Sequence, residues 1–427
     1  MLIRSLFLFN ICLFLTACSV NPVTGESQFS MVSAEQEVSM GAKQYAPSQQ
    51  GQGGRYIVDP NLSVYVSSVG RKLSQLSDRP NLPYEFVVLN NPDPNAWALP
   101  GGKIAINRGL LVKLKDEAQL ASVLSHEIVH AAARHGATQM TQKILLGMGS
   151  QLATIATQNT GYGELAAMGS QLGGGLFQAS YGRDQELEAD AFGIKYMSKA
   201  GYDPQAAVEL QKTFLQLSKG SQKNGLGNMF ASHPPSQQRI DANRQHVANY
   251  PSKYTTRNKA TFDRAMRQLR RDQRAYDYHQ QALTAFNNSQ LEKANLLIQQ
   301  AINAQPNEAL FWVTKGQLAL QANTFKTAAS AFKKAQQLYP EYYMPKLGSG
   351  LAALKLKRYD SAEQLFNDSL EILPTQIAVY YLGEIKLIRG QTDQAVKYFE
   401  EAAKGGGELG SNAQKRLQQL VPAAVKN

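Results

Sequence analysis

A strict spacing of 34 residues toward the C-terminus constrains the fold of this chain more than any other feature. Four series of positions share the interval and agree in phase, which makes coincidence implausible. Small alanines let two helices approach closely, and prolines interrupt the chain between repeats. The pattern therefore predicts an α-solenoid of stacked helix pairs. The series are Pro306, Pro340 and Pro374; Ala294, Ala328 and Ala362; Ile298, Phe332 and Phe366; and Leu291, Phe325 and Tyr359.

This period and these residue types are the signature of tetratricopeptide repeats. A degraded fourth unit follows, with Ala395 and Phe399 in the corresponding places, and it ends in the glycines at 405–407. A last helix over 411–420 is expected to cap the stack. We predict a repeat domain over 275–422, with a concave surface suited to peptides or partner proteins.

The N-terminus has the features of an export signal. Arg4 gives a positive start, and the apolar run 6–15 has the length of a signal-peptide core. The run ends in Leu-Thr-Ala-Cys18, which resembles a lipobox. Residues 1–17 are therefore predicted to be a lipoprotein-type signal peptide, cleaved before a lipidated Cys18; an ordinary signal peptide is the alternative. Ser19 after the cysteine favours the outer membrane.

Cysteine content and charge exclude several classes of protein. The two cysteines, Cys12 and Cys18, both lie near the N-terminus, so an internal disulfide framework is excluded. The net charge is +11, but eight basic and two acidic side chains are concentrated in 253–274. That segment is predicted to be a basic helical linker, and nucleic acid is not expected as a partner. A solvated connector is favoured over contact with an anionic membrane or an acidic partner.

Residues 18–252 are predicted to form an α+β domain. The polar stretch 21–52 is expected to be a tether with a first helix near 34–45, and 62–76 reads as an amphipathic helix. Strands over 84–89 and 97–106, the second bent at Gly101-Gly102, indicate a small sheet. Helices are expected from Asp116 and over 183–199, and amphipathic helices with mobile joints over 141–181.

His126-Glu127-Ile128-Val129-His130 is an H-E-x-x-H sequence in a chain with only six histidines. Residues four apart share one face of a helix, so both imidazoles can reach one Zn²⁺. Glu127 lies beside them and can take a proton from water that zinc acidifies. The helix is predicted to begin at Asp116, with Gln119 completing a capping-box pattern. A buried helix with solvated histidines is the alternative.

A third ligand must come from elsewhere in the chain. The metzincin pattern fails, because Ala133 and Gly136 stand where it requires Gly and His. His135 comes one residue too early and is expected to point away from the ligand face. The candidates are Glu164, Asp184, Glu186, Glu188 and Asp190.

On a helix over 183–199, Glu186 and Asp190 share one face. Glu186 can then ligate zinc, and Asp190 can orient a ligand imidazole or lie near the leaving group. Ala189 between them permits close helix packing. Glu188 lies on another face and is expected to be a solvated charge.

His126-Glu127-x-x-His130 followed by Glu186-x-x-Ala189-Asp190 resembles the HtpX and CAAX-prenyl-protease class of zinc metallopeptidases. The resemblance implies a zincin-type domain that binds one Zn²⁺ through His126, His130 and Glu186. It also implies Glu127 as the catalytic glutamate and Asp190 as the proton donor. A signal sequence and C-terminal tetratricopeptide repeats resemble the periplasmic members of this class that assist β-barrel assembly. The lipobox departs from their pattern, which indicates altered targeting.

Two further segments resemble parts of this class. Asn95, Ala96, Trp97 and Ala98 resemble its edge strand, which could hold an extended peptide by β-augmentation; a plain structural hairpin is the alternative. Ser232-His233-Pro234-Pro235 resembles its His-Pro loop. His233 could be a fourth zinc ligand that shuts the site, or a solvated loop histidine. Arg239 could steady the loop or an oxyanion.

The expected fold is mainly α: an α+β zincin metallopeptidase domain followed by an α-solenoid. We predict a periplasmic zinc endopeptidase, anchored to the outer membrane through lipidated Cys18. Its substrates would be misfolded or stalled envelope proteins, and its repeats would dock outer-membrane assembly machinery. The alternative is a non-proteolytic chaperone or scaffold with a silenced or self-inhibited zinc site. The intact motif favours the enzyme.

Overall fold

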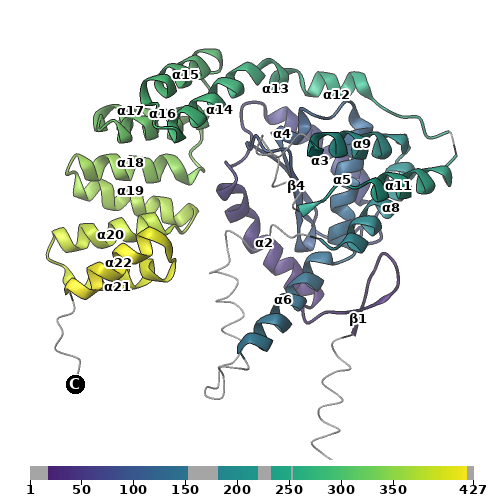
Figure 1. The fold of residues 1–427 in the computed structure, drawn as a ribbon, viewed down its shortest axis with the longest axis horizontal. Coiled ribbons are helices and arrows are strands. Elements are labelled where there is room, and N and C mark those ends of the chain that lie inside the picture. Colours follow the sequence, from purple (N-terminus) through teal and green to yellow (C-terminus); the bar gives the residue numbers. More distant parts are fainter. Residues whose placement is uncertain (1–17, 152–180, 220–231, 252, 421–427) are drawn as a thin grey trace, which may run out of the picture. The chain divides into compact units, whose positions relative to one another are not determined.

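The computed structural model describes residues 18–151, 181–219, 232–251 and 253–420. The predicted signal peptide, Glu164 and most of the predicted helices of 141–181 lie outside these ranges. The chain divides into two compact units, one up to Arg270 (unit 1) and one from Arg271 (unit 2). Helices dominate both units, which confirms the prediction of a mainly helical fold (Figure 1).

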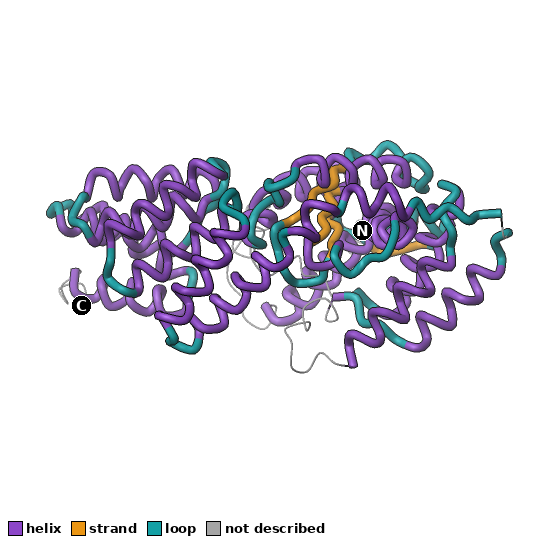
Figure 2. Tube along the Cα trace, turned by 90° about the horizontal axis from the view of Figure 1, so that it is seen from above, coloured by secondary structure: helices purple, strands orange, loops and turns teal. Residues whose placement is uncertain are grey.

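Unit 1 carries all the strands of the described residues, drawn in orange in Figure 2. Its elements before the H-E-x-x-H helix are β1 (Cys18–Val20), β2 (Ser27–Phe29), α2 (Ala34–Gly51), α3 (Pro60–Ser74), β3 (Glu85–Leu89), β4 (Ala96–Leu99), η1 (Pro100–Gly102), β5 (Lys103–Asn107) and α4 (Arg108–Leu111). The later elements are α5 (Glu117–Ala132), α6 (His135–Gln151), α8 (Arg183–Lys199), α9 (Gln205–Lys219), α11 (Gln237–Ala248), α12 (Lys259–Ala265) and α13 (Arg267–Arg271).

The small sheet has three strands in the order β3-β5-β4. The single strand predicted over 97–106 is in fact two strands, β4 and β5, because Gly101 adopts a left-handed φ of 75° inside η1. β5 pairs in parallel with β3 and antiparallel with β4, which leaves β4 at the edge. The sheet packs against α3 and α5, with Val88, Leu89 and Ile104 almost fully buried.

Helix α5 begins where the sequence predicts, because the Asp116 carboxylate accepts a hydrogen bond of 2.9 Å from the Gln119 backbone N–H. The reciprocal half of the capping box is absent, since Gln119 Oε1 accepts from the Lys115 backbone N–H instead. α8 packs along α5, Ala189 is fully buried, and Gly193 lies at this contact. A Cβ placed on Gly193 would lie 3.2 Å from the backbone nitrogen of His126. The absence of a side chain at Gly193 therefore sets how closely α8 approaches the motif.

The prediction of a tether from residue 21 is wrong for the first residues of the stretch. β1 and β2 pair antiparallel into a two-stranded ribbon, which we call the N-terminal hairpin (18–29). Its inner face is bonded to the rest of unit 1: Arg134 donates to Ser19 Oγ, and Gln28 lies against the Ala133 carbonyl. The following helix, predicted over 34–45, extends to Gly51.

The basic segment 253–274 holds two short helices, α12 and α13, and the beginning of α14. Arg257 in this segment is not a free solvated charge, because it pairs with Asp116, Asp203 and Glu209 at 3.2, 2.9 and 2.8 Å. Phe262 is completely buried, and α12 contacts α3 and α5. The first part of the segment is therefore integrated into unit 1. No helix of the described ranges is both long and apolar enough to cross a membrane.

Unit 2 consists of successive antiparallel helix pairs and a last helix. The elements are α14 (Gln273–Asn287), α15 (Leu291–Ala304), α16 (Ala309–Gln321), α17 (Phe325–Leu338), α18 (Tyr343–Lys355), α19 (Tyr359–Ile372), α20 (Gln376–Ile388), α21 (Thr392–Lys404) and α22 (Gly407–Leu420). The predicted prolines lie between pairs, and the predicted alanines are fully buried. A Cβ on Gly348 would lie 2.4 Å from the Phe332 ring, so glycine admits this aromatic side chain between neighbouring helices.

A second repeated feature of unit 2 is a left-handed residue in each turn within a pair. Ser289, Asn323 and Lys357 have φ values of 59°, 55° and 59°, and Gly390 has 69°. Only the last is a glycine, the residue that adopts this conformation without strain. The left-handed conformation of these turns therefore could not be predicted from residue type, although the turn positions recur with the repeats.

Candidate metal centre

Four side chains from three parts of unit 1 converge at the H-E-x-x-H motif. His126 and His130 come from α5, Glu186 from α8 and His233 from the loop before α11, and each offers one ligand atom within 4.8 Å of the others. The Nε2 atoms of His126 and His130 are 3.1 Å apart, and His130 Nε2 lies 3.3 Å from Glu186 Oε1. His233 Nδ1 lies 2.9 Å from Glu186 Oε1 and 3.3 Å from His126 Nε2.

These separations fit a tetrahedral metal site. Ligand atoms at about 2.0–2.1 Å from a tetrahedral zinc are about 3.3–3.4 Å from one another. The nitrogen and carboxylate donors found here are also ligand types that zinc accepts. The cluster thus matches a metal in both spacing and chemistry, and its fourth corner is taken by His233.

Asp190 lies behind the cluster and orients His126. Its Oδ1 is 3.0 Å from His126 Nδ1, so the opposite nitrogen, Nε2, faces the other ligands. Burial raises the pKa of Asp190, but the Arg239 guanidinium and the bond to His126 outweigh burial and hold that pKa below its usual value. These contacts match the orienting role that the sequence left open for Asp190. A carboxyl that stays ionised is poorly suited to donating a proton.

Arg239 connects α11 to two of the acidic residues of α8, Glu186 and Asp190. It is 4% exposed, donates to Asp190 through Nε and Nη2 at 2.7 Å each, and approaches Glu186 Oε2 at 2.6 Å. It also donates to the Pro234 carbonyl at 3.3 Å. Arg239 therefore balances two buried carboxylates and holds the loop that carries His233.

Glu127 is 2% exposed, and its Oε2 accepts no hydrogen bond from the described residues. Burial raises its pKa, and nearby His233 and His126 reduce the rise. For Glu186, burial also opposes ionisation, but His233, His126 and Arg239 together lower the pKa well below its ordinary value. The surroundings therefore shift the pKa values of the two glutamates in opposite directions. Glu186 is a stable anion, and Glu127 is the better proton acceptor near neutral pH.

Several contacts of the cluster were missed by sequence reasoning. Tyr181 stacks on the His130 ring, with centroids 3.7 Å apart and planes at 17°. His135 is not among the four converging side chains, and its Nδ1 lies 2.8 Å from His130 Nδ1. The prediction that Glu188 is a solvated charge is wrong, because Glu188 bonds Asn21 at 2.8 Å and lies 3.4 Å from His135 Nε2. Asp184 is exposed.

Strand β4 contains Ala96, Trp97 and Ala98, and Asn95 directly precedes it. All four residues are at most 8% exposed. Among the described strands β4 pairs with β5 alone, and it packs against α5, the helix that carries the motif. The segment is therefore an edge strand of the described sheet that contacts the helix of the motif, and its side chains are buried in the fold.

Comparison with known proteins gives a family match for each of the two parts of the chain. Residues 60–247 match Peptidase family M48. The chain carries an M48 metallopeptidase domain. Residues 279–343 and 347–408 match the tetratricopeptide repeat, which confirms the repeat prediction. The family also confirms the resemblance read from the motifs, the prediction of a metallopeptidase, and the requirement for a metal.

The proteins similar to this chain include bacterial and mitochondrial proteases. The β-barrel assembly-enhancing protease of Escherichia coli is 28% identical over 347 residues, covering 74% of this chain and 70% of the relative. A Vibrio cholerae relative is 32% identical over 207 residues, covering 46% of this chain but only 41% of its own length. The mitochondrial metalloendopeptidase OMA1 of Schizosaccharomyces pombe is 33% identical over 229 residues, covering 51% and 63%.

Proposed function

We propose that this protein is a zinc-dependent endopeptidase of the bacterial cell envelope that acts on misfolded or stalled proteins. The convergence of His126, His130 and Glu186 beside buried Glu127 carries the proposal. The names of the bacterial relatives, which join proteolysis to β-barrel assembly, support the envelope setting. Proteolysis of an unfolded protein, with about one zinc per chain by elemental analysis, tests it; a purified chain without bound metal would contradict it.

In this proposal His126, His130 and Glu186 hold the zinc. When bound, zinc supplies Lewis-acid polarisation of the scissile carbonyl and acidifies the attacking water. Glu127 accepts the proton of that water, because its carboxylate is buried and its Oε2 has no competing bond from the described residues. Asp190 keeps His126 oriented. The proton-donor role that the family resemblance implies for Asp190 is disfavoured by its bidentate bond to Arg239.

An extended substrate segment is proposed to add to the edge of β4 that pairs with no other described strand. The backbone of Ala96–Leu99 already pairs on one side with β5, so a peptide could pair with the other side. β4 also contacts α5, which would bring the added peptide near the motif. Backbone pairing recognises chain conformation more than sequence, which suits unfolded substrates.

His233 is proposed to inhibit the enzyme as a fourth ligand. Its Nδ1 occupies the remaining corner of the cluster, and Arg239 holds its loop. The position of His233 in the cluster also supports the alternative function, a chaperone or scaffold whose zinc site is self-inhibited. The two functions are separated by whether releasing His233 produces proteolysis.

The His233→Ala variant is expected to cleave unfolded protein several-fold faster than the wild type, because it frees the fourth coordination position for substrate and water. The measurement is kcat/KM on an unfolded protein substrate at saturating zinc. The matched control is His246→Ala, which removes a histidine of α11 outside the cluster. Unchanged proteolysis in His233→Ala would remove the inhibitory role.

Anchoring to the outer membrane through lipidated Cys18 is also part of the proposal. In the N-terminal hairpin, Ser19 and Gln28 are cross-strand partners and face unit 1. Alternation of side chains places Val20 and Phe29 on the opposite face, where they are 55% and 41% exposed. Met31, just beyond, is 43% exposed. An apolar outer face directly after the lipidation position suits a surface held against a bilayer.

Cys18→Ser is expected to move the chain from the membrane fraction to the soluble periplasmic fraction and to abolish incorporation of labelled fatty acid. The control is Cys12→Ser, which removes the other cysteine and should leave both readouts as in the wild type. Retention of Cys18→Ser in the membrane fraction would contradict lipid anchoring at this residue.

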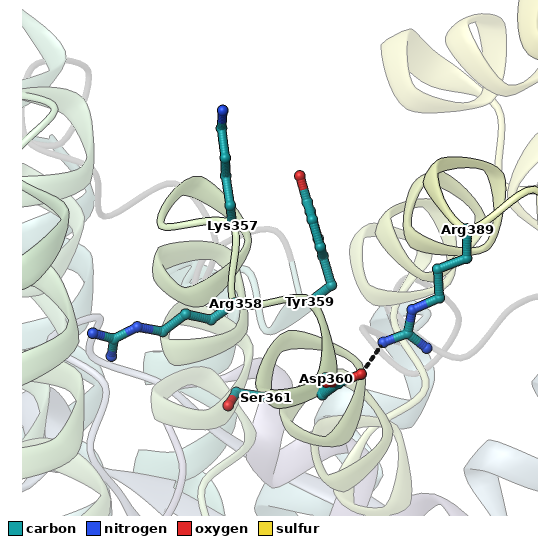
Figure 3. Close-up of a pocket in the computed structure, with 6 residues that line it drawn as sticks. All are labelled: Lys357, Arg358, Tyr359, Asp360, Ser361 and Arg389. Carbon is teal, nitrogen blue, oxygen red and sulfur yellow. Dashed lines mark hydrogen bonds and ion pairs between the residues drawn. The ribbon is translucent and has the colours of Figure 1, made fainter.

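The repeats are proposed to dock partners, including outer-membrane assembly machinery. One hollow of unit 2, about 470 Å³ in volume, lies at the turn between α18 and α19 (Figure 3). Lys357 and Tyr359 extend from this turn, while Arg389 is held by an ion pair with Asp360.

We propose 18–252 and 275–422 as the peptidase and repeat domains, joined by 253–274; the family matches fall inside these ranges.

A further inference from the structure

The side of His130 that faces away from the cluster meets a series of polar side chains, two buried and one, Glu188, partly exposed. His130 Nε2 faces the other ligands, and its Nδ1 lies 2.8 Å from His135 Nδ1. His135 Nε2 lies 3.4 Å from Glu188 Oε1, and Asn21 Nδ2 donates to the same oxygen at 2.8 Å. His130, His135 and Asn21 are 1%, 2% and 6% exposed. We call this series the His135–Glu188–Asn21 chain.

The two facing Nδ1 atoms admit two arrangements of one proton. If His130 donates, its Nε2 carries the lone pair and can bind a metal. If His135 donates, the neutral His130 carries its proton on Nε2 and cannot. Glu188 decides between them, because its carboxylate favours a proton on His135 Nε2, which leaves His135 Nδ1 as the acceptor.

We propose that His135 and Glu188 are positioning residues that fix His130 in its metal-binding tautomer, and that Asn21 ties the N-terminal hairpin to this function. The proposal rests on the proposed metal site. None of the three residues is among the four converging side chains. They act on the affinity for zinc through His130.

The backbone conformation between α5 and α6 brings His135 to His130. Five residues along a continuous helix are rotated by about 140°, so His135 would face away from His130. Helix α5 ends at Ala132, and Arg134 adopts a left-handed φ of 63° before α6 begins. The break returns His135 to the His130 ring. Arg134 is held in this conformation by bonds to Ser19 Oγ, Glu37 and the Val32 carbonyl.

The hairpin directs Asn21 at Glu188. Asn21 Oδ1 accepts from the backbone N–H of Val23 at 2.9 Å, and its own N–H donates to the Glu26 carbonyl at 2.8 Å. These bonds fix the side-chain amide with Nδ2 pointing at Glu188. The hairpin that follows Cys18 thus contacts both the break at Arg134 and the carboxylate that orients His135. Its docking is coupled to metal binding.

The test measures zinc affinity of the full chain by competition with a chelator, without proteolysis. His135→Leu and Glu188→Met remove the acceptor and the carboxylate, and each is expected to weaken zinc binding about 10- to 100-fold. His135→Asn places an amide oxygen near the position of Nδ1 and is expected to restore most of the affinity. Asn21→Ala is expected to give a smaller loss.

The matched control is Asp184→Asn, which removes an exposed carboxylate from the same helix as Glu188 and should bind zinc like the wild type. Thermal melts of the zinc-free variants check that each is folded. Wild-type affinity in His135→Leu, or equal losses in His135→Leu and His135→Asn, would overturn the positioning role. A wild-type chain that binds no zinc would instead contradict the proposed function.

Discussion

Glu127→Gln is expected to reduce peptidase activity about 10²- to 10⁴-fold, the usual contribution of a general base. Glutamine keeps the size and shape of the side chain but cannot accept the proton of the attacking water. Burial raises the pKa of Glu127, which brings its carboxylate closer to the working pH and makes it an effective base. Zinc content should stay at the wild-type level, because the four converging ligand atoms belong to other residues.

The measurement is cleavage of an unfolded protein by wild type and variant, with zinc determined by elemental analysis on the same samples. Glu85→Gln is the control, since this strand glutamate is largely exposed and remote in sequence from the motif. Equal activity in Glu127→Gln and wild type would overturn the enzyme assignment. Normal envelope integrity in cells that carry only Glu127→Gln would favour the chaperone or scaffold function.

Arg239→Met is expected to destabilise zinc-free unit 1 by about 3–5 kcal/mol, the cost of breaking a buried ion pair on one side. Arg239 is 4% exposed and is the guanidinium that pairs with both Glu186 and Asp190. Its removal leaves two buried carboxylates without this cation and releases the Pro234 carbonyl. Arg239→Lys keeps the charge but loses the bidentate geometry, so an intermediate loss is expected.

Urea unfolding followed by Trp97 fluorescence measures this effect within unit 1. The chain has two tryptophans, so a Trp312→Phe background leaves Trp97 as the reporter. Arg244→Met is the matched control: Arg244 is on the same helix, its side chain is 50% exposed, and its pair with Asp241 should contribute at most about 1 kcal/mol. Equal losses in the two variants would contradict the role given to Arg239.

The parts that the sequence predicted well depend on local geometry. The i and i+4 spacing of His126 and His130 on one helix, and of Glu186 and Asp190 on another, requires only regular helices. The repeat domain was also predictable, because each helix pair packs mainly on its neighbours and the same residues recur at 34-residue intervals. Here a pattern in the chain corresponds directly to a pattern of contacts.

The errors lie where two distant segments meet. Glu188 appeared solvated because its helix face differs from that of Glu186, yet Asn21, 167 residues earlier, provides its partner. The hairpin was expected to be a tether because its composition is polar. Its polar side chains instead bond Arg134 and the end of α5. Composition does not reveal such pairing when each partner alone resembles a surface residue.

The sequence by itself determined the order of the two domains, the repeat architecture and the metallopeptidase motif, and it predicted Glu186 and Asp190 on one helix face, because each is encoded in spacing within one segment. Only the tertiary structure decided which groups surround the metal ligands. The left-handed backbone at Arg134 turns His135 toward His130, and Arg239 draws the His233 loop against α8. Both effects arise from bonds between segments that lie close only after folding. A periodic pattern within one segment of the sequence therefore cannot reveal them.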